Sequence, residues 1–312
     1  MTLISAIVVN YNNADVLEEA LTALAGASGS LLEIIVVDNA STDRSAEVGR
    51  SFGSSVTWIQ SETNSGYSAA VNRGAASAKG DYLAILNNDV ITDALTLERL
   101  VARLEELDGV VMIAPRLLLN NGATQWTCRE LPSVAGELAD LVGLSGVLPE
   151  GAGGYLLGRW AHRSSRMVQQ AAGAALVLSR QLFREINGFD ERYPLYFEDV
   201  DFCRRVGDRG HIYFDHDITM VHVAEATATV FRSRTTKAIA LGRYRYFRYN
   251  CSRVAAEFVR VLGILRAVSR GTVLGLRFAL TRRQDDEAKS RAYFSAVRLL
   301  AWKPLAYNPL ED

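Results

Sequence analysis

The chain has 312 residues, of which 49% are hydrophobic and 22% charged, and its formal net charge is -1. These values are ordinary for a globular protein with one large domain or two modest ones. No apolar run reaches the length of a membrane-spanning helix, and no basic segment followed by an apolar core marks a signal peptide. We therefore expect a cytoplasmic protein that does not cross a bilayer.

The three cysteines, Cys128, Cys203 and Cys251, lie far apart and lack the spacing of metal ligands. Their odd number leaves at least one thiol without a disulfide partner in the chain. We therefore expect reduced cysteines that serve in packing, as is usual for a cytosolic protein.

Strand and helix patterns alternate through the first part of the chain. Apolar, β-branched runs predict strands at residues 4–9, 34–37, 56–59, 82–86 and 110–113. Helical spacing predicts helices at residues 15–24, 67–78 and 95–107, with a further helix capped by residues 41–43. Gly80 is expected to cap the helix at 67–78. The alternation predicts an α/β fold, with a mainly parallel sheet covered by helices on both faces.

Polar residues follow three of the predicted strands. They are Asn10 to Asn13, Asp38 with Asn39, and Asn87 to Asp89. In open parallel sheets, ligands bind where the carboxyl ends of the strands meet. We therefore expect these three clusters to converge on one binding site.

The periodic pattern weakens after residue 117. We expect loops and short helices from 117 to 166, and an apolar run at 171–178 that lines the floor of a pocket. Short strands are predicted at 212–214 and 218–221, ending near His222. From residue 236 onward the pattern is helical, with arginine and lysine interleaved among apolar residues.

Asp89 closes an otherwise apolar strand and offers hard oxygen ligands. With no thiolate nearby, this carboxylate suits Mg²⁺ or Mn²⁺ rather than zinc, and a metal there would neutralise a diphosphate. His222 is the candidate second ligand. The alternatives are an ordinary turn around Asp89 and a histidine that belongs to the core or the surface.

Asp38 suits hydrogen bonds from a base or a ribose, and Arg73, on the helix after the turn at 64–67, suits a phosphate. The alternatives are a helix cap and an exposed helix charge. The first strand is not followed by Gly-x-Gly-x-x-Gly, which counts against a dinucleotide dehydrogenase. The sequence also contains no Walker A motif and no Gly-x-Ser-x-Gly nucleophile elbow.

Three acids, Glu198, Asp199 and Asp201, crowd into four positions after an aromatic run. One interpretation is a solvated helix start, where the helix dipole and unpaired N–H groups favour acids. The other is a catalytic carboxylate at the edge of a pocket, beside groups that set its pKa. The cluster by itself favours neither interpretation.

Five segments in this order resemble the family 2 glycosyltransferases of the GT-A fold, and the resemblance covers residues 3–225. The segments are Val8 to Asn12, Val37 to Asp43, Asn64 to Arg73, Leu86 to Asp89 and Gly188 to Asp201. The last resembles most closely the bacterial rhamnosyltransferases that build cell-wall and surface polysaccharides. The resemblance implies a nucleotide-sugar-binding half at 1–115, an acceptor-binding and catalytic half at 116–230, and a basic helical extension at 231–312.

The resemblance also implies roles for individual residues. Asp199 would be the general base, and Asp89 with His222 would hold Mg²⁺ or Mn²⁺. Asn87 replaces the first acid of the family's Asp-x-Asp element, which weakens the metal site by one charge. The donor nucleotide would be bound by Asn10, Tyr11, Asn12, Asp38, Asn64, Gly66, Arg73 and Asn88. The donor sugar and the acceptor would lie against Ala172, Gly173, Glu198 and Asp201.

The implied reaction is inverting transfer of a sugar from a nucleoside diphosphate to a glycan or a polyprenyl-linked acceptor. The first expectation for the donor is dTDP-L-rhamnose, and a UDP-hexose is the alternative. A sugar-nucleotide pyrophosphorylase would need a glycine-rich basic loop, which Asn10 to Asn13 do not supply. A non-catalytic nucleotide-sugar-binding module is the remaining alternative, and the presence of Asp89 and Asp199 argues against it.

Basic residues dominate between residues 232 and 303, where the acids are Glu257, Asp285, Asp286 and Glu287. Arginine-rich amphipathic helices bind anionic lipid, so we expect this segment at the inner face of the plasma membrane. The alternative is a set of helices that packs on the rest of the chain or on a second subunit of a homodimer. No recognition motif accompanies the charge, so nucleic acid is not an expected partner.

Overall fold

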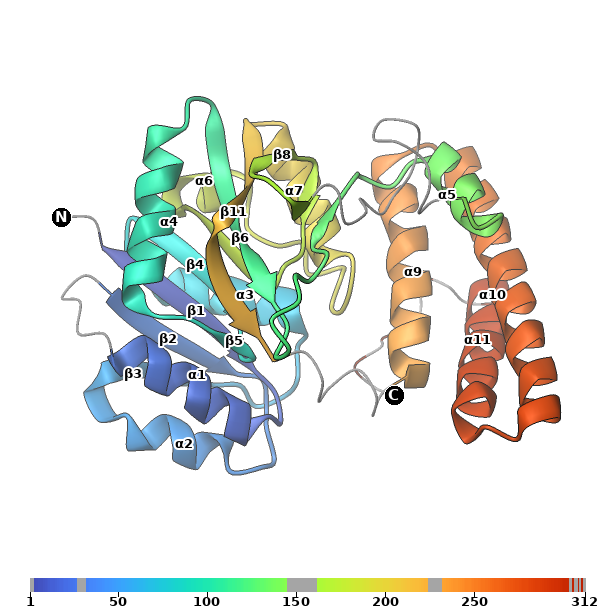
Figure 1. The fold of residues 1–312 in the computed structure, drawn as a ribbon, viewed down its shortest axis with the longest axis horizontal. Coiled ribbons are helices and arrows are strands. Elements are labelled where there is room, and N and C mark those ends of the chain that lie inside the picture. The colour runs from blue at the N-terminus through green and yellow to red at the C-terminus, as the bar shows by residue number, and fades with distance from the viewer. Residues whose placement is uncertain are drawn as a thin grey trace. The chain divides into compact units, whose positions relative to one another are not determined.

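The computed structural model describes residues 3–26, 32–144, 162–223 and 232–302, together with residues 305, 308 and 310. The chain forms two compact units (Figure 1). The first consists of Met1–Leu131, Leu157–Arg192 and Glu198–Ala224. The second consists of Pro132–Leu156, Tyr193–Phe197 and Glu225–Asp312. The short segment Tyr193–Phe197 therefore interrupts the first unit in sequence but packs with the second.

One sheet runs through the first unit. In the described ranges its strands are β1 (Ile4–Asn10), β2 (Leu32–Asp38), β3 (Val56–Gln60), β4 (Tyr82–Asn87), β5 (Val90–Ile91), β6 (Val110–Leu118), β8 (Arg166–Val168), β10 (Ala175–Ser179) and β11 (His211–His222). Their order is β3-β2-β1-β4-β10-β6-β11-β5, with β8 beside β11. Strands β1 to β4 are parallel to one another, as are β6 and β11, which confirms the predicted mainly parallel sheet. A small second sheet pairs β7 (Cys128–Arg129) with β9 (Gln170–Ala171).

Helices cover both faces of the large sheet, as predicted (Figure 1). They are α1 (Ala14–Gly26), α2 (Ser45–Ser51), α3 (Tyr67–Ser77), α4 (Ala94–Glu106), α6 (Arg180–Glu185) and α7 (Glu198–Gly207), with a 3-10 turn, η1, at Gly53–Ser55. Residues of α1, α2 and α4 pack in one apolar cluster with Ala6 and Val8 of β1. Residues of α3, α6 and α7 pack in a second cluster with Ile7. Neighbouring residues of β1 thus point to opposite faces, and both faces are buried.

Strand β10 corrects the expectation that residues 171–178 line the floor of a pocket. Residues 175–178 lie instead in the middle of the sheet, antiparallel to β4 on one side and to β6 on the other. Leu176, Val177 and Leu178 are fully buried. A strand covered on both faces is apolar throughout. Its sequence therefore lacks the alternation of apolar and polar residues that would distinguish a strand from the lining of a pocket.

The two short strands predicted at 212–214 and 218–221 are one strand, β11, with a register shift between Asp215 and Thr219. Asp215 Oδ1 accepts hydrogen bonds from the backbone N–H groups of Asp217 and Ile218, which satisfies donors that the shift removes from the ladder. Between residues 117 and 166 the structure describes the end of β6, β7 and helix α5 (Val134–Leu141). The part of that prediction that covers 145–161 lies outside the described residues.

Both predicted helix caps are wrong. The N-cap residue of α2 is Arg44, one residue after the predicted cap at 41–43, and it has no side-chain cap hydrogen bond. Asp43 Oδ1 instead accepts a hydrogen bond from the backbone N–H of Ser45, the first residue of the helix, at 3.0 Å. Gly80 does not cap α3, because that helix ends at Ser77 with Ala78 as its C-cap residue. Gly80 serves a close approach instead, since a Cβ there would lie 2.6 Å from the backbone nitrogen of Ser5.

The cysteine prediction is confirmed for two of the three residues. Cys128 and Cys203 are buried, and burial raises the pKa of both thiols, to about 12 for Cys128. Cys251 is exposed, so the packing prediction is wrong for this residue.

The second unit is helical, as predicted for the chain after residue 236. It contains α5, α9 (Arg232–Asn250), α10 (Arg253–Thr281) and α11 (Gln284–Trp302), and α10 packs against the other three. Arg243 and Arg266 bind Glu137 on α5, with N–O distances of 2.9 and 2.6 Å. In the described ranges, the helices are all too short or too polar to cross a membrane.

Gly74 lets α3 lie directly against the sheet. A Cβ at this position would lie 2.5 Å from Ile7 Cγ2 and 3.1 Å from Val37 Cγ2, and both side chains are fully buried. Overpacking of a filled core is destabilising, so we expect Gly74→Ala to lower the free energy of unfolding by about 1–3 kcal/mol. Denaturant unfolding measures the change. Gly207→Ala is the control, because a Cβ there has no atom within 4 Å; equal losses in both variants would contradict the packing account.

Candidate active site

The polar residues at the ends of β1, β2 and β4 meet at one edge of the sheet, as the sequence predicts. Asn10 Nδ2 donates a hydrogen bond to Asp38 Oδ1 at 2.8 Å, and Asn88 Nδ2 donates to Asn10 Oδ1 at 2.6 Å. We call these three residues the polar edge. Three separate strands thus contribute to one continuous hydrogen-bonded row at the carboxyl end of the sheet.

Asp38 is the buried centre of the polar edge, with no exposed surface. Besides Asn10, its carboxylate accepts hydrogen bonds from Ser41 N (2.9 Å), Ser41 Oγ (2.5 Å) and Gln60 Nε2 (2.7 Å). Each oxygen therefore has two donors from the protein. A nucleotide base that hydrogen-bonds to Asp38 would have to displace one of these donors.

The loop after β1 is fixed by the loop after β2. Asn12 adopts a left-handed backbone with φ of 49°, and its Oδ1 accepts a hydrogen bond from the backbone N–H of Thr42 at 2.7 Å. The backbone N–H of Asn12 donates to Ser41 Oγ at 2.9 Å. Tyr11, between these fixed points, is exposed. The loop thus presents an aromatic ring to solvent from a rigid backbone.

A second loop, at residues 64–66, is held by buried Asn39. Asn39 Nδ2 donates to Asn64 Oδ1 at 2.9 Å and to Gly66 O at 3.1 Å. Gly66 has a φ of 90°, a backbone conformation that residues with a side chain rarely adopt. On the helix that follows, exposed Arg73 donates to Ser61 Oγ at 2.5 Å, and the backbone N–H of Ser61 donates to Asp38 O at 2.8 Å. Arg73 thus lies one residue away from the polar edge.

Asp89 and His222 form the pair that the sequence predicts. His222 Nε2 lies 3.0 Å from Asp89 Oδ1, and His222 Nδ1 lies 2.7 Å from Gln125 Oε1. With an amide oxygen at Nδ1, that nitrogen carries the ring hydrogen, and Nε2 faces the carboxylate. Nε2 and the carboxylate at this distance need either a proton or a cation between them. The pair therefore suits two arrangements, a histidine–aspartate ion pair and a divalent cation held by both side chains.

The pair supplies two ligands only. Among the described residues, no group of three or more His, Cys, Asp or Glu side chains gathers in a way that would hold a metal. A cation at Asp89 and His222 would need its remaining ligands from water or from a bound molecule such as a diphosphate. Such an open site suits a metal that binds together with its substrate rather than a structural metal.

Asp199 lies near the start of α7, with its carboxylate against the residues that follow β9. Its Oδ2 accepts hydrogen bonds from the backbone N–H of Gly173 and from Gln170 Nε2, each at 3.1 Å. Its Oδ1 accepts from the backbone N–H of Val200 at 2.9 Å. Burial raises the pKa of Asp199, and the charge of Arg129 and the N–H donors partly offset this rise. A carboxylate with a raised pKa is a candidate for a base.

Gly173 allows this close approach. A Cβ at Gly173 would lie 3.1 Å from Asp199 Cβ. On its other side, the carbonyl of Gly173 accepts a hydrogen bond from the Tyr67 hydroxyl at 2.9 Å. The neighbouring Ala172 donates its backbone N–H to Thr127 O at 3.0 Å. The predicted small-residue segment at 172–173 therefore lies beside the candidate base.

Tyr67 links the candidate base to the candidate metal site. Burial raises the pKa of Tyr67 well above its ordinary value, and the charges of Glu198, Asp199 and Asp89 raise it further. All three carboxylates are thus close enough to act on one phenol. In addition, Asn87, two residues before Asp89, donates its backbone N–H to Ala174 O, one residue after Gly173.

The other two acids of the cluster differ from Asp199. Burial raises the pKa of Glu198 well above its ordinary value, and repulsion from Asp199 adds to the rise. Asp201 is buried and forms an ion pair with Arg205 at 2.7 Å. Arg205 also donates to the backbone carbonyls of Ile186 and Gly188. Asp201 thus anchors, through Arg205, the chain before the cluster.

Sequence reasoning missed the polar partners of the candidate site. Gln125, Arg129 and Gln170 lie in the part of the chain with no clear period, where an isolated polar residue has no distinguishing neighbours. Tyr67 is different, because it directly follows the turn at 64–66 and precedes Arg73 on the same helix. In the sequence, its position at the start of this helix was the one feature that could have indicated a place for Tyr67 in the site.

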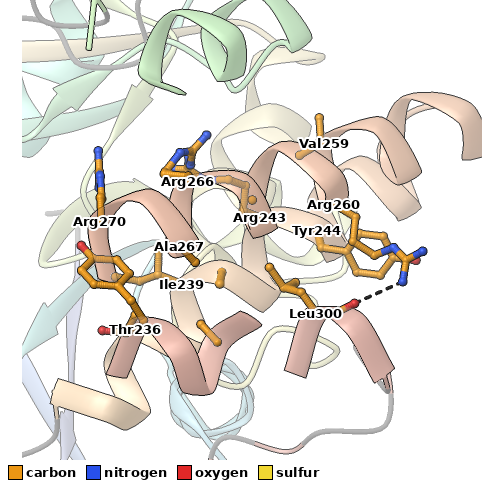
Figure 2. Close-up of a pocket in the computed structure, with 14 residues that line it drawn as sticks. Thr236, Ile239, Arg243, Tyr244, Val259, Arg260, Arg266, Ala267, Arg270 and Leu300 are labelled. Carbon is orange, nitrogen blue, oxygen red and sulfur yellow. Dashed lines mark hydrogen bonds between the residues drawn. The ribbon is translucent and has the colours of Figure 1, made fainter. Parts of the chain in front are cut away.

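The second unit contains a pocket of its own, which includes none of the predicted site residues (Figure 2). It lies among α9, α10 and α11, with an apolar lining that includes Ile239, Val259 and Leu300. Arginines of the lining bind acids of α5; for example, Arg266 Nη1 lies 3.1 Å from Asp140 Oδ2. Arg260 donates to Leu300 O at 3.1 Å. These charges are used in helix packing, so the pocket is not a second polar site of the kind seen in the first unit.

Residues 5–146 match the family model described as glycosyl transferase family 2. Among curated proteins, an N-acetylglucosaminyl-diphospho-decaprenol L-rhamnosyltransferase of Mycobacterium tuberculosis is 25% identical over 239 residues. That alignment covers 72% of this chain and 78% of the relative. The sequence similarity thus extends beyond the matched family segment.

Two solved structures share the fold. The mannosyltransferase PcManGT from Pyrobaculum calidifontis, in complex with GDP-Man and Mn²⁺, aligns with a TM-score of 0.58 at 16% identity, over 96% of this chain and 87% of that one. S. aureus TarS 1–349, in complex with UDP-GlcNAc, aligns with a TM-score of 0.54 at 17% identity, over 95% and 81% of the two chains. The family match, the curated relative and the shared architecture agree with the resemblance drawn from the five segments. Residues 5–146 thus match the glycosyl transferase family 2 model, and the chain shares its fold with these two solved structures.

Proposed function

We propose that this protein is an inverting glycosyltransferase in which Asp199 is the general base. The observation that carries the proposal is the position of Asp199, which is half-buried and accepts a hydrogen bond from the backbone N–H of Gly173. The next residue, Ala174, accepts a backbone hydrogen bond from Asn87, two residues before Asp89. A raised pKa suits a base that must take a proton from an alcohol and still be charged near neutral pH.

The proposed step needs no enzyme nucleophile. Asp199 takes the proton of an acceptor hydroxyl while the hydroxyl oxygen attacks the anomeric carbon of the donor. The bond between that carbon and the diphosphate oxygen breaks, and its electron pair leaves with the nucleoside diphosphate. Attack opposite the leaving group inverts the anomeric centre. Gln170 and the N–H of Gly173 hold the carboxylate in one orientation throughout.

Asp89 Oδ1 and His222 Nε2 are the atoms that would hold Mg²⁺ or Mn²⁺, and Gln125 fixes the histidine ring for this role. When bound, the cation supplies positive charge that stabilises a departing diphosphate. Asn87, in place of a further acid, keeps the protein's own charge at the site low. We therefore infer that cation and nucleotide bind together, each completing the other's site.

The polar edge, Arg73 and Tyr11 are the proposed contacts of the donor nucleotide. We propose dTDP-L-rhamnose as the donor, on the resemblance to rhamnosyltransferases and on the rhamnosyl transfer in the relative's name. A UDP-hexose is the alternative, and the fold relatives bind GDP-Man or UDP-GlcNAc. The proposed acceptor is a glycan or a polyprenyl-linked sugar, in line with the decaprenol in the relative's name.

A polyprenyl acceptor would require access to a membrane, and α10 offers a surface for one. Apolar side chains are exposed along most of this helix: Val254, Phe258, Val261, Leu265, Val268, Val273, Leu276 and Leu280. Exposed arginines, including Arg270 and Arg277, lie among them. Apolar residues with interleaved arginines are typical of helices that lie on anionic lipid. We propose that α10 binds the cytoplasmic membrane surface.

Replacement of the proposed base separates chemistry from binding. We expect Asp199→Asn to lose at least about 1000-fold in kcat while nucleotide binding persists, because only proton removal is affected. Thermal unfolding with dTDP, UDP and GDP, each with and without Mn²⁺, measures binding. Asp208→Asn, an exposed acid near the end of α7, is the control. Turnover by Asp199→Asn at the wild-type rate would disprove the assignment of the base.

The pH dependence of turnover tests the environment of Asp199. A base must be deprotonated, so we expect kcat to fall as the pH is lowered through the pKa of Asp199. Because burial raises this pKa, the fall should occur at higher pH than for an ordinary aspartate, whose pKa is about 3.9. Gln170→Leu removes a donor to the charged form and should move the fall to still higher pH. Gln181→Leu, on exposed α6 surface, should leave it in place; an unmoved profile in Gln170→Leu would refute the account.

Binding to vesicles tests the proposed membrane surface. We expect the protein to sediment with phosphatidylglycerol vesicles, less at high salt, and not with phosphatidylcholine vesicles. Leu276→Asp with Leu280→Asp should abolish sedimentation, because both side chains are exposed on α10. Leu95→Asp, at a leucine on α4 that is 61% exposed, is the control. Unchanged binding by the α10 variant would rule out this surface.

A further inference from the structure

His162, in the segment that precedes β8, is a buried histidine outside the candidate active site. It is 3% exposed, and its ring lies edge to face on that of Phe214, with centroids 5.4 Å apart. Its Nε2 atom lies 2.9 Å from the backbone nitrogen of Thr127 and 2.9 Å from that of Cys128. Because a backbone N–H can only donate, Nε2 accepts both hydrogen bonds. The ring is therefore neutral, with its hydrogen on Nδ1.

A second histidine, His216, holds the backbone of His162. Arg116 Nη1 lies 3.1 Å from His216 Nε2, and a guanidinium can only donate. His216 Nδ1 therefore carries the ring hydrogen and donates it to the carbonyl oxygen of His162, at 2.9 Å. His216 lies in the register shift of β11, and Arg116 lies on the neighbouring strand β6. The large sheet thus fixes His162 in place.

The two N–H groups that His162 accepts belong to a segment that supports residues 170–173. The carbonyl oxygen of Thr127 accepts the backbone N–H of Ala172 at 3.0 Å. Cys128 is the first residue of β7, which pairs with β9. A displacement of this segment would therefore displace β9 and the residues that directly follow it.

Residues 170–173 include both donors to Asp199 Oδ2. Gln170 Nε2 and the backbone N–H of Gly173 each lie 3.1 Å from this oxygen. Burial raises the pKa of Asp199, and the charge of Arg129, the second residue of β7, lowers it. The position of β7 and β9 therefore determines both the orientation of the Asp199 carboxylate and its proton affinity.

We propose that His162 is a positioning residue, which fixes β7 and, through β7 and β9, the position of the Asp199 carboxylate. A buried backbone N–H needs an acceptor, and here one ring nitrogen serves two adjacent N–H groups. All residues of this argument belong to the first unit. The inference rests on the proposed role of Asp199 as general base.

The test compares His162→Leu with His162→Gln in the full chain. Leucine leaves the two N–H groups without an acceptor, whereas the glutamine amide oxygen reaches the Nε2 position and has two lone pairs. The assay follows nucleotide release, with water as the acceptor, from dTDP-L-rhamnose, UDP-glucose or GDP-mannose, whichever donor the wild-type protein consumes. We expect kcat of His162→Leu to fall about 10- to 100-fold, because a misplacement of about 1 Å can cost about 100-fold. His162→Gln should restore kcat.

The KM for the donor separates positioning of the base from a general loss of structure. In His162→Leu, this KM and the rise in Tm that the nucleotide produces should stay at wild-type values. The reason is that the polar edge is formed at the ends of β1, β2 and β4, to which neither β7 nor β9 contributes.

The pH profile is the second readout that a merely structural role would not move. The fall of kcat at low pH should move to higher pH in His162→Leu, because a displaced Arg129 lowers the pKa of Asp199 less. His162→Gln should return the profile to its wild-type position. Further titratable groups act on Asp199 from α7 and α3, which the change leaves in place; they are Glu198, Cys203 and Tyr67.

The matched control is His211→Leu, which makes the same change at an exposed histidine of the same unit. It should keep the wild-type kcat and pH profile. If His162→Leu does not fold, His162→Asn replaces it, because the asparagine amide ends short of the Nε2 position. The same fall in kcat with an unchanged donor KM is expected.

The outcomes separate the two proposals. Turnover by Asp199→Asn at the wild-type rate would remove the proposed function, and with it this inference. An inactive Asp199→Asn together with wild-type kcat in folded His162→Leu would overturn only the role of His162. Failure of His162→Gln to restore kcat would also overturn it, as would an equal loss of kcat and of nucleotide stabilisation in His162→Leu.

Discussion

The candidate site depends on one constraint, which is that the buried carboxylate of Asp38 must be satisfied without water. A buried charge is tolerated only when it is well hydrogen-bonded. The donors are Asn10 at the end of β1, Ser41 in the loop after β2 and Gln60 at the end of β3. The ends of these strands must therefore meet at the same point, and Asn10 in turn accepts a hydrogen bond from Asn88. The rigidity of the polar edge follows from this requirement. A preformed edge lowers the entropy cost of binding a nucleotide.

The chemistry proposed for the protein needs two further groups at a fixed distance from this edge. The strand pairing of β4 with β10 brings Asp89 and Gly173 into one neighbourhood, since the two residues flank the paired segments. Tyr67 donates a hydrogen bond from α3 to Gly173 O. Asp199 reaches Gly173 from α7, where it accepts the hydrogen bond of the Gly173 N–H. The antiparallel strand β10 thus lies between the polar edge and Asp199 in the connectivity of the unit.

Much of this arrangement could be predicted from the sequence, and the rest could not, for physical reasons. The parallel strands and the convergence of Asn10, Asp38 and Asn88 follow from local patterns and from the rule for parallel sheets. The central position of β10 does not, because a run such as residues 175–178 has no period and pairs with strands far away in the chain. The contacts of Gln125 and Gln170 are with residues distant in sequence, to which no local pattern points.

The central claim is that a nucleoside diphosphate and a cation occupy one site formed by the polar edge, Asp89 and His222. Crystals grown with Mn²⁺ and the nucleotide that stabilises the protein most would test it by anomalous scattering. The account predicts one manganese peak, about 2.0–2.3 Å from Asp89 Oδ1 and His222 Nε2, with the diphosphate as a further ligand and the base near Asp38. A nucleotide bound elsewhere, or a bound nucleotide with no manganese at this pair, would contradict it.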